Sequence, residues 1–116
     1  MPSDDPAGRL RDIIENIDRI ESYVAGMVFD DYSADRKTKD AVERCLQRIT
    51  EAARKLGDEM DGRNPGVPWK AIREMGSILR HNYDKILDDV IWGTVASDLA
   101  LLRAACEAEL KRLGKG

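Results

Sequence analysis

Apolar residues recur every three or four positions along almost the whole chain. The first run includes Leu10, Ile13, Ile17 and Ile20, and three further runs follow with the same spacing. Such spacing places apolar side chains on one face of an α-helix, and no segment shows the strict alternation of a half-buried strand. The pattern predicts helices over about residues 6–28, 34–60, 69–82 and 88–113. We therefore expect an all-α protein, an antiparallel four-helix bundle.

Residues with known preferences for helix ends support these boundaries. Pro6 fits the first turn of the first helix, Ser33 or Asp35 can cap the second, and Gly114 follows the last. The segment 61–68 holds the densest cluster of Gly and Pro and predicts a loop. A chain of 116 residues is about the size of one domain, so we expect a single domain over residues 1–116.

Composition limits the classes of function. Charged residues make up 35% of the chain and the formal net charge is -3, so any contact with RNA needs a local basic patch. No apolar run approaches membrane-spanning length and the N-terminus lacks an export signal, which predicts a cytoplasmic protein without membrane contact.

Cys45 and Cys106 lie at apolar helical positions and are expected to be buried free thiols. No sequence pattern for a metal site or a phosphate-binding loop is present, and we expect neither metal nor cofactor.

The single histidine, His81, ends a polar and basic stripe on the third predicted helix. Arg73, Ser77 and Arg80 share this stripe at steps of three or four residues. Histidine changes its charge closest to neutral pH, so His81 is a candidate acid or base. The alternative is a solvated helix face that ends in a histidine near the helix C-terminus.

Gly76 interrupts the third predicted helix at a cost of about 1 kcal/mol relative to alanine. The glycine is either a tolerated weak position or a place where another backbone or a ligand must come close.

The order of short motifs along the chain closely resembles the HepT-like proteins of the HEPN superfamily. The resemblance covers nearly the whole chain, and its motifs are Asp12-Ile13-Ile14, Asp40-Ala41-Val42-Glu43-Arg44, Ile49-Thr50-Glu51-Ala52-Ala53, Pro68-Trp69-Lys70-Ala71-Ile72, His81-Asn82-Tyr83-Asp84 and Ile91-Trp92.

This resemblance implies a helical bundle that forms a homodimer through its motif helices. It further implies the toxin of a toxin–antitoxin pair, partnered by a nucleotidyltransferase-like antitoxin. The family motif is Arg, four residues, His, one residue, Tyr. Its Arg and His imply a metal-independent RNase site, and its Tyr accepts AMP from the antitoxin. His81 and Tyr83 match this motif.

The motif arginine is replaced in this chain, because Gly76 stands five positions before His81. The sequence is similar to a branch of the family in which the arginine stands next to the histidine, here as Arg80. One hypothesis is therefore an RNase with His81 and Arg80 as catalytic residues and with Arg73, Ser77 and Asn82 in support. The other is a dimeric binding module that keeps the antitoxin surface and has lost RNA cleavage. Tyr83 is either the AMP acceptor or a tyrosine of the core or an interface.

Overall fold

The computed structural model of the protein describes residues 4–81 and 84–115, and these residues form helices without any strand. The prediction of an all-α helical bundle is therefore confirmed for the part of the chain that the structure describes. The helices are α1 (Pro6–Val24), α2 (Phe29–Ala34), α3 (Arg36–Leu56), α4 (Trp69–His81), α5 (Asp84–Gly93), the π-helix η1 (Thr94–Asp98) and α6 (Leu99–Arg112).

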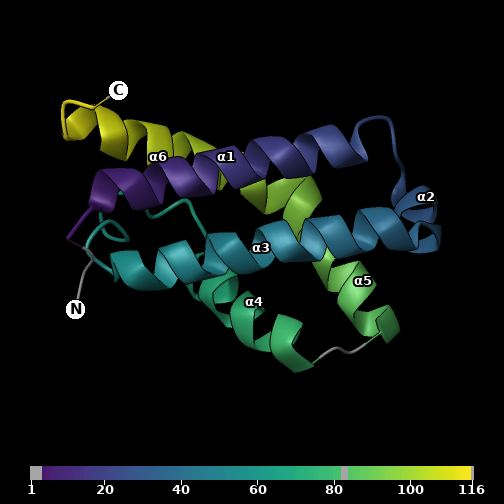
Figure 1. The fold of residues 1–116 in the computed structure, drawn as a ribbon. Coiled ribbons are helices and arrows are strands. Elements are labelled where there is room, and N and C mark those ends of the chain that lie inside the picture. Colours follow the sequence, from purple (N-terminus) through teal and green to yellow (C-terminus); the bar gives the residue numbers. More distant parts are fainter. Residues whose placement is uncertain (1–3, 82–83, 116) are drawn as a thin grey trace.

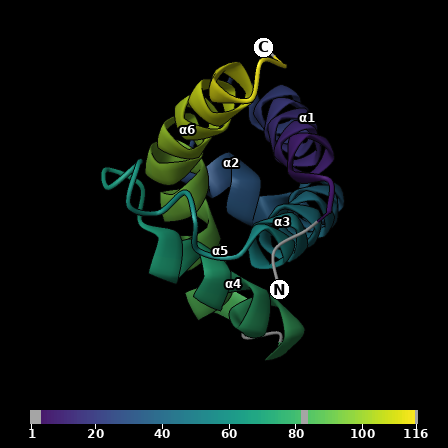
Figure 2. The ribbon, with the colours of Figure 1, turned by 90° about the vertical axis from the view of Figure 1, so that its left-hand side faces the viewer.

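The two longest helices, α1 and α3, lie antiparallel and side by side along the length of the molecule (Figure 1). In the view turned by 90° from Figure 1, α6 flanks α1, and α4 packs below α3 (Figure 2). In this arrangement α3 packs against α1 on one side and against α4 on another. The candidate histidine lies at the end of α4.

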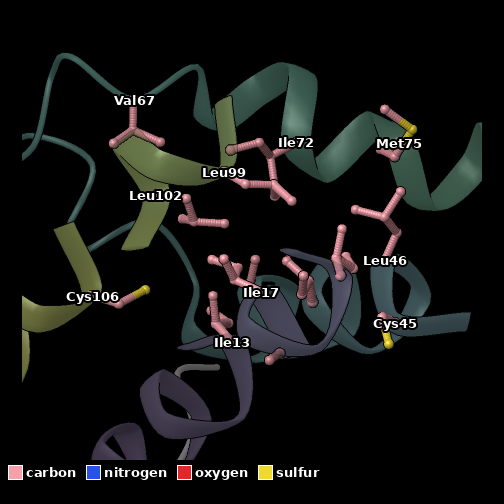
Figure 3. Close-up of a cluster of buried hydrophobic side chains, with 14 of the residues drawn as sticks. Ile13, Ile17, Cys45, Leu46, Val67, Ile72, Met75, Leu99, Leu102 and Cys106 are labelled. Atoms are coloured by element: carbon pink, nitrogen blue, oxygen red, sulfur yellow. The ribbon is translucent and has the colours of Figure 1, made fainter. Parts of the chain in front are cut away.

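One cluster of apolar side chains joins the helices, with contributions from α1, α3, α4, α6 and the loop before α4 (Figure 3). Cys45 and Cys106 are both buried and free, as predicted. Burial raises the pKa of the Cys106 thiol to about 12, so this sulfur stays protonated at neutral pH. No helix among the described residues is long and apolar enough to cross a membrane.

The first connection contains a helix that the sequence did not predict. The first predicted helix extended to residue 28, but α1 ends at Val24, and Gly26 with φ 79° turns the chain. Residues 29–34 then form α2 because Tyr32 is buried against Trp92, with ring centroids 5.2 Å apart. The acidic and turn-prone residues of this segment are typical of a connection, and their spacing does not reveal the contact between Tyr32 and Trp92.

The second predicted helix has its start confirmed and its end corrected. Asp35 caps α3, since its carboxylate accepts a hydrogen bond from the Thr38 backbone N–H at 3.1 Å. The helix ends at Leu56, not near residue 60, because Gly57 takes a φ of 74°. Met60 still lies in the core, which explains why its apolar character suggested a longer helix.

The last predicted helix also needs two corrections. It begins at Asp84 rather than near residue 88, and it contains the π-helix η1. Thr94 donates its hydroxyl to the Val90 carbonyl at 3.1 Å at the start of this wider turn. Ile91 before this turn and Leu99 after it are both buried. An apolar spacing pattern does not distinguish such a turn from an ordinary helix.

The loop before α4 is fixed by one buried carboxylate, that of Glu109 on α6. Its oxygens accept hydrogen bonds from Arg63 at 2.7 and 3.1 Å, from Asn64 at 3.1 Å and from Arg112 at 3.2 Å. Trp69, the first residue of α4, donates its indole N–H to the Asn64 carbonyl at 2.9 Å. Glu109 therefore positions the start of the helix that carries the candidate site.

We expect Glu109→Gln to lower the free energy of unfolding at neutral pH by about 1–3 kcal/mol, because it weakens charge-assisted hydrogen bonds. The Arg63 hydrogen bonds hold the pKa of Glu109 at about 2, below its ordinary value of 4.5. The contribution is therefore complete above about pH 5 and is lost as the pH falls towards about 2. Urea unfolding of both proteins at a series of pH values measures this, and a difference that stays constant down to about pH 3 would contradict it.

Candidate functional site

His81 is exposed in the last turn of α4, and a hydrogen bond fixes its ring. Nδ1 lies 2.7 Å from the Ser77 carbonyl oxygen, one turn earlier in the helix. A carbonyl only accepts, so Nδ1 must carry the proton in this contact. In the neutral ring the lone pair then belongs to Nε2. This tautomer suits a base that takes a proton through Nε2.

The guanidinium of Arg80 reaches back over Gly76. One of its terminal nitrogens lies 3.8 Å from the point where a Cβ at Gly76 would stand. Side chains on a helix lean towards the preceding turn, which explains this direction. The positive group of Arg80 thus occupies space next to position 76, where the resemblance places the motif arginine.

Gly76 is explained by α3 of the same chain. A Cβ at this position would lie 3.2 Å from the Thr50 hydroxyl oxygen and 3.4 Å from the Thr50 Cβ, a tight contact. Thr50 is buried, and its hydroxyl donates to the Gln47 carbonyl at 3.0 Å. The glycine therefore lets α4 pack closely against α3 within one chain, and its neighbour is the Thr50 side chain rather than another backbone or a ligand.

Glu51 follows Thr50 and lies at the edge of this site. Arg54 hydrogen-bonds to its carboxylate at 2.7 and 3.2 Å and holds the pKa of Glu51 below its usual range, and the charges of Arg54, Lys55 and Arg80 act in the same direction. Glu51 is exposed and ion-paired, and its electrostatic link to Arg80 depends on how α3 and α4 pack.

Arg73 is directed away from His81 and towards the loop after α3. It forms two hydrogen bonds with Asp61, at 2.7 and 2.9 Å, and also donates to the Gly57 carbonyl. Its guanidinium carbon lies 5.5 Å from the Trp69 ring centroid. The structure therefore brings Arg73 to the α3 end and the loop, whereas Ser77, Arg80 and His81 stay together at the end of α4.

Two predicted site residues, Asn82 and Tyr83, lie outside the residues that the structure describes. Their assigned roles and the expected homodimer therefore stay predictions. Among the described residues, no group of three or more His, Cys, Asp and Glu side chains is arranged to hold a metal ion.

Comparison with known proteins identifies the family. The model of the family described as "Ribonuclease HepT-like" matches residues 13–109, which include α4 and His81. The chain belongs to the HepT-like ribonuclease family. The family resemblance inferred from the order of motifs is therefore confirmed.

Two relatives show how far the similarity to HepT-like proteins extends. A protein of Methanocaldococcus jannaschii described as "Putative RNase" is 37% identical over 95 residues, which cover 82% of this chain and 78% of the relative. A "Probable ribonuclease HepT" of Thermococcus cleftensis is 34% identical over 98 residues, covering 84% of this chain and 89% of the relative. No solved structure matches significantly.

Proposed function

We propose that this protein is the toxin of a HepT-type toxin–antitoxin pair and acts in the cytoplasm as a metal-independent endoribonuclease. Family membership supports the reaction class. The observation that carries the assignment to residues is the hydrogen bond from His81 Nδ1 to the Ser77 carbonyl, because it sets the tautomer that a general base needs.

In the proposed reaction, His81 Nε2 takes the proton of an RNA 2′-hydroxyl. The 2′-oxygen attacks the adjacent phosphorus, the bond from phosphorus to the 5′-oxygen breaks, and that oxygen leaves with a proton from solvent. Arg80 donates hydrogen bonds to the phosphoryl oxygens while negative charge builds on them. The planar guanidinium suits this role because it can hold two oxygens at once.

A second copy of the chain completes the site in this proposal. Consecutive helical residues point about 100° apart, so Arg80 and His81 of one chain diverge. His81 is at the exposed end of α4, where it can face the same helix of another copy. A dimer that brings Arg80 of one subunit to His81 of the other aims both groups at one phosphate.

The products test this mechanism. We expect the purified protein to cleave RNA in the presence of EDTA and to leave 2′,3′-cyclic phosphate and 5′-hydroxyl ends, because the attacking oxygen is the 2′-oxygen. Mass spectrometry of the fragments identifies the ends. A 5′-phosphate, or activity that EDTA abolishes, would overturn the proposed chemistry.

We further propose that a nucleotidyltransferase-like antitoxin neutralises the toxin by transferring AMP to Tyr83, an assignment that rests on the family resemblance. Incubation with such an enzyme and ATP is expected to add one AMP, located on Tyr83 by peptide mass spectrometry. Tyr83→Phe should remain unmodified. An adduct of equal yield on Tyr83→Phe would move the acceptor to another residue.

A further inference from the structure

A second polar surface lies between α1 and α3, the helix against which α4 also packs. It is a groove of about 420 Å³, a volume in the usual range for small-ligand sites. Five basic residues line it, and three acidic residues accompany them. The basic residues are Arg9, Arg19, Arg44, Arg48 and Lys55.

Two of these cations have no acidic partner among the described residues. Arg19 pairs with Glu15 at 2.6 Å, Arg9 with Asp12 at 3.5 Å and Lys55 with Glu51 at 3.9 Å.

In contrast, within the described part of the chain Arg44 donates only to the neutral Gln47 side chain, at 3.2 Å, and Arg48 forms no ion pair. Five cations and three carboxylates leave an excess of two positive charges in a protein whose net charge is -3. The groove therefore attracts an anion.

The groove is also lined by two uncharged polar residues, Asn16 and Gln47. Asn16, which is 5% exposed, donates its amide N–H to the Asp12 carbonyl at 2.8 Å, while its side-chain oxygen has no hydrogen-bond partner among the described residues. The buried Nε of Arg9 also has no such partner there. Apart from Ala52, the residues that line the groove are charged or polar, and such a lining favours a polar occupant over the apolar face of another helix.

The groove and the candidate site share α3. Glu51 lines the groove, and the charge of Arg80 is among those that lower its pKa. Its neighbour Thr50 is the residue against which Gly76 of α4 packs. A chain of phosphates that passes the end of α4 can therefore continue over α3 towards Arg48 and Arg44.

We propose that the groove between α1 and α3 binds the phosphodiester backbone of the RNA strand beside the bond that is cleaved. Arg44 and Arg48 contact the phosphates, and the remaining groove residues supply a polar, partly neutralised surface. This inference rests on the proposed ribonuclease function and extends it from the reacting phosphate to the neighbouring nucleotides.

Binding of a short single-stranded oligoribonucleotide to the His81→Ala protein tests the groove without cleavage. We expect Arg44→Glu/Arg48→Glu to raise the dissociation constant, measured by fluorescence anisotropy, at least about tenfold. For single strands, each lost phosphate contact reduces the slope of the logarithm of the binding constant against the logarithm of the salt concentration by about 0.7 in magnitude. The loss of two contacts should therefore reduce this slope by about 1.4. Arg44→Lys/Arg48→Lys should retain most of the affinity, because the charges remain.

Lys37→Glu/Lys111→Glu is the matched control, since it makes the same change in net charge at exposed positions outside the groove. An equal loss of affinity in this control would reduce the effect to overall charge and overturn the proposal. Unchanged RNA binding by the Arg44→Glu/Arg48→Glu variant would also overturn the proposal. If this variant lost only self-association or antitoxin binding, the groove would be a protein interface and the proposal would fail as well.

The cleavage assay separates the groove from the proposed function. If the wild type cleaves RNA, the groove variant should show a raised KM with kcat nearly unchanged, because the reacting groups remain in place. An unchanged KM would overturn the groove while leaving the ribonuclease intact. If the wild type binds RNA through the groove and cleaves none, the ribonuclease proposal fails and the binding surface stands.

Discussion

Replacing His81 with alanine is expected to reduce the rate of RNA cleavage by about 10²–10⁴-fold, the usual contribution of a positioned general base. The physical reason is the fixed tautomer, because the Ser77 carbonyl holds the proton on Nδ1 and leaves the Nε2 lone pair to act as the base. The measurement is the single-turnover rate on a labelled RNA, with wild type and variant at the same saturating concentration.

The matched control for His81→Ala is Lys70→Ala, at an exposed position in the first turn of the same helix. Thermal unfolding followed by circular dichroism should be nearly the same for all three proteins, since both substituted side chains are exposed. Equal cleavage by His81→Ala and the wild type would remove His81 from the reaction. Cleavage lost together with the helical signal would instead show that the residue is needed for folding.

Arg80→Ala is expected to lower cleavage by about 10²–10³-fold, the effect of removing one group that stabilises charge in the transition state. Moving the arginine tests whether the guanidinium itself is required. The Arg80 side chain reaches back to within 3.8 Å of the Cβ position of Gly76, so an arginine introduced there can supply the same group. We therefore expect Gly76→Arg/Arg80→Ala to regain a measurable part of the lost rate.

An arginine at position 76 needs space that the Thr50 side chain partly occupies. A Cβ at Gly76 meets the Thr50 hydroxyl at 3.2 Å, so the variant that also carries Thr50→Ala should regain more activity and stability than the double variant. Arg11→Ala, at an exposed position on α1, serves as the control for loss of one positive charge. Full activity of Arg80→Ala would show that this arginine has not taken over the role of the motif arginine.

The two variants together separate the two hypotheses drawn from the sequence. A catalytic protein loses cleavage in both His81→Ala and Arg80→Ala, whereas a binding module shows no cleavage to lose and still takes up AMP on Tyr83. Arg73→Ala is not equivalent to either, because Arg73 holds Asp61 and the Gly57 carbonyl, and its loss should act on stability.

Local patterns were sufficient for much of the fold. Apolar residues at steps of three and four predicted α1, α3 and α4, because the helical repeat places such residues on one face whatever they pack against. Asp35 was found as a cap, since capping involves residues only three positions apart. The Gly and Pro cluster before α4 predicted the loop for the same reason, and the single histidine pointed to the candidate site.

Contacts between distant residues decided the rest. The helix α2 depends on the contact between Tyr32 and Trp92, which are 60 positions apart in the sequence. Within the basic stripe, Arg73 turned to Asp61 and Arg80 came to lie over Gly76. The helical repeat determines the direction in which each side chain points around the helix axis, but it does not determine which residue that side chain will contact.

By itself, then, the sequence determined that this chain is helical, which faces of its helices are apolar, and that His81 lies near the end of the third predicted helix. Only the tertiary structure placed Thr50 against Gly76, linked Glu51 with Arg80 and formed the basic groove between α1 and α3. These relations depend on the relative positions of packed helices. Such positions follow from the shapes of many side chains at once rather than from spacing along the chain.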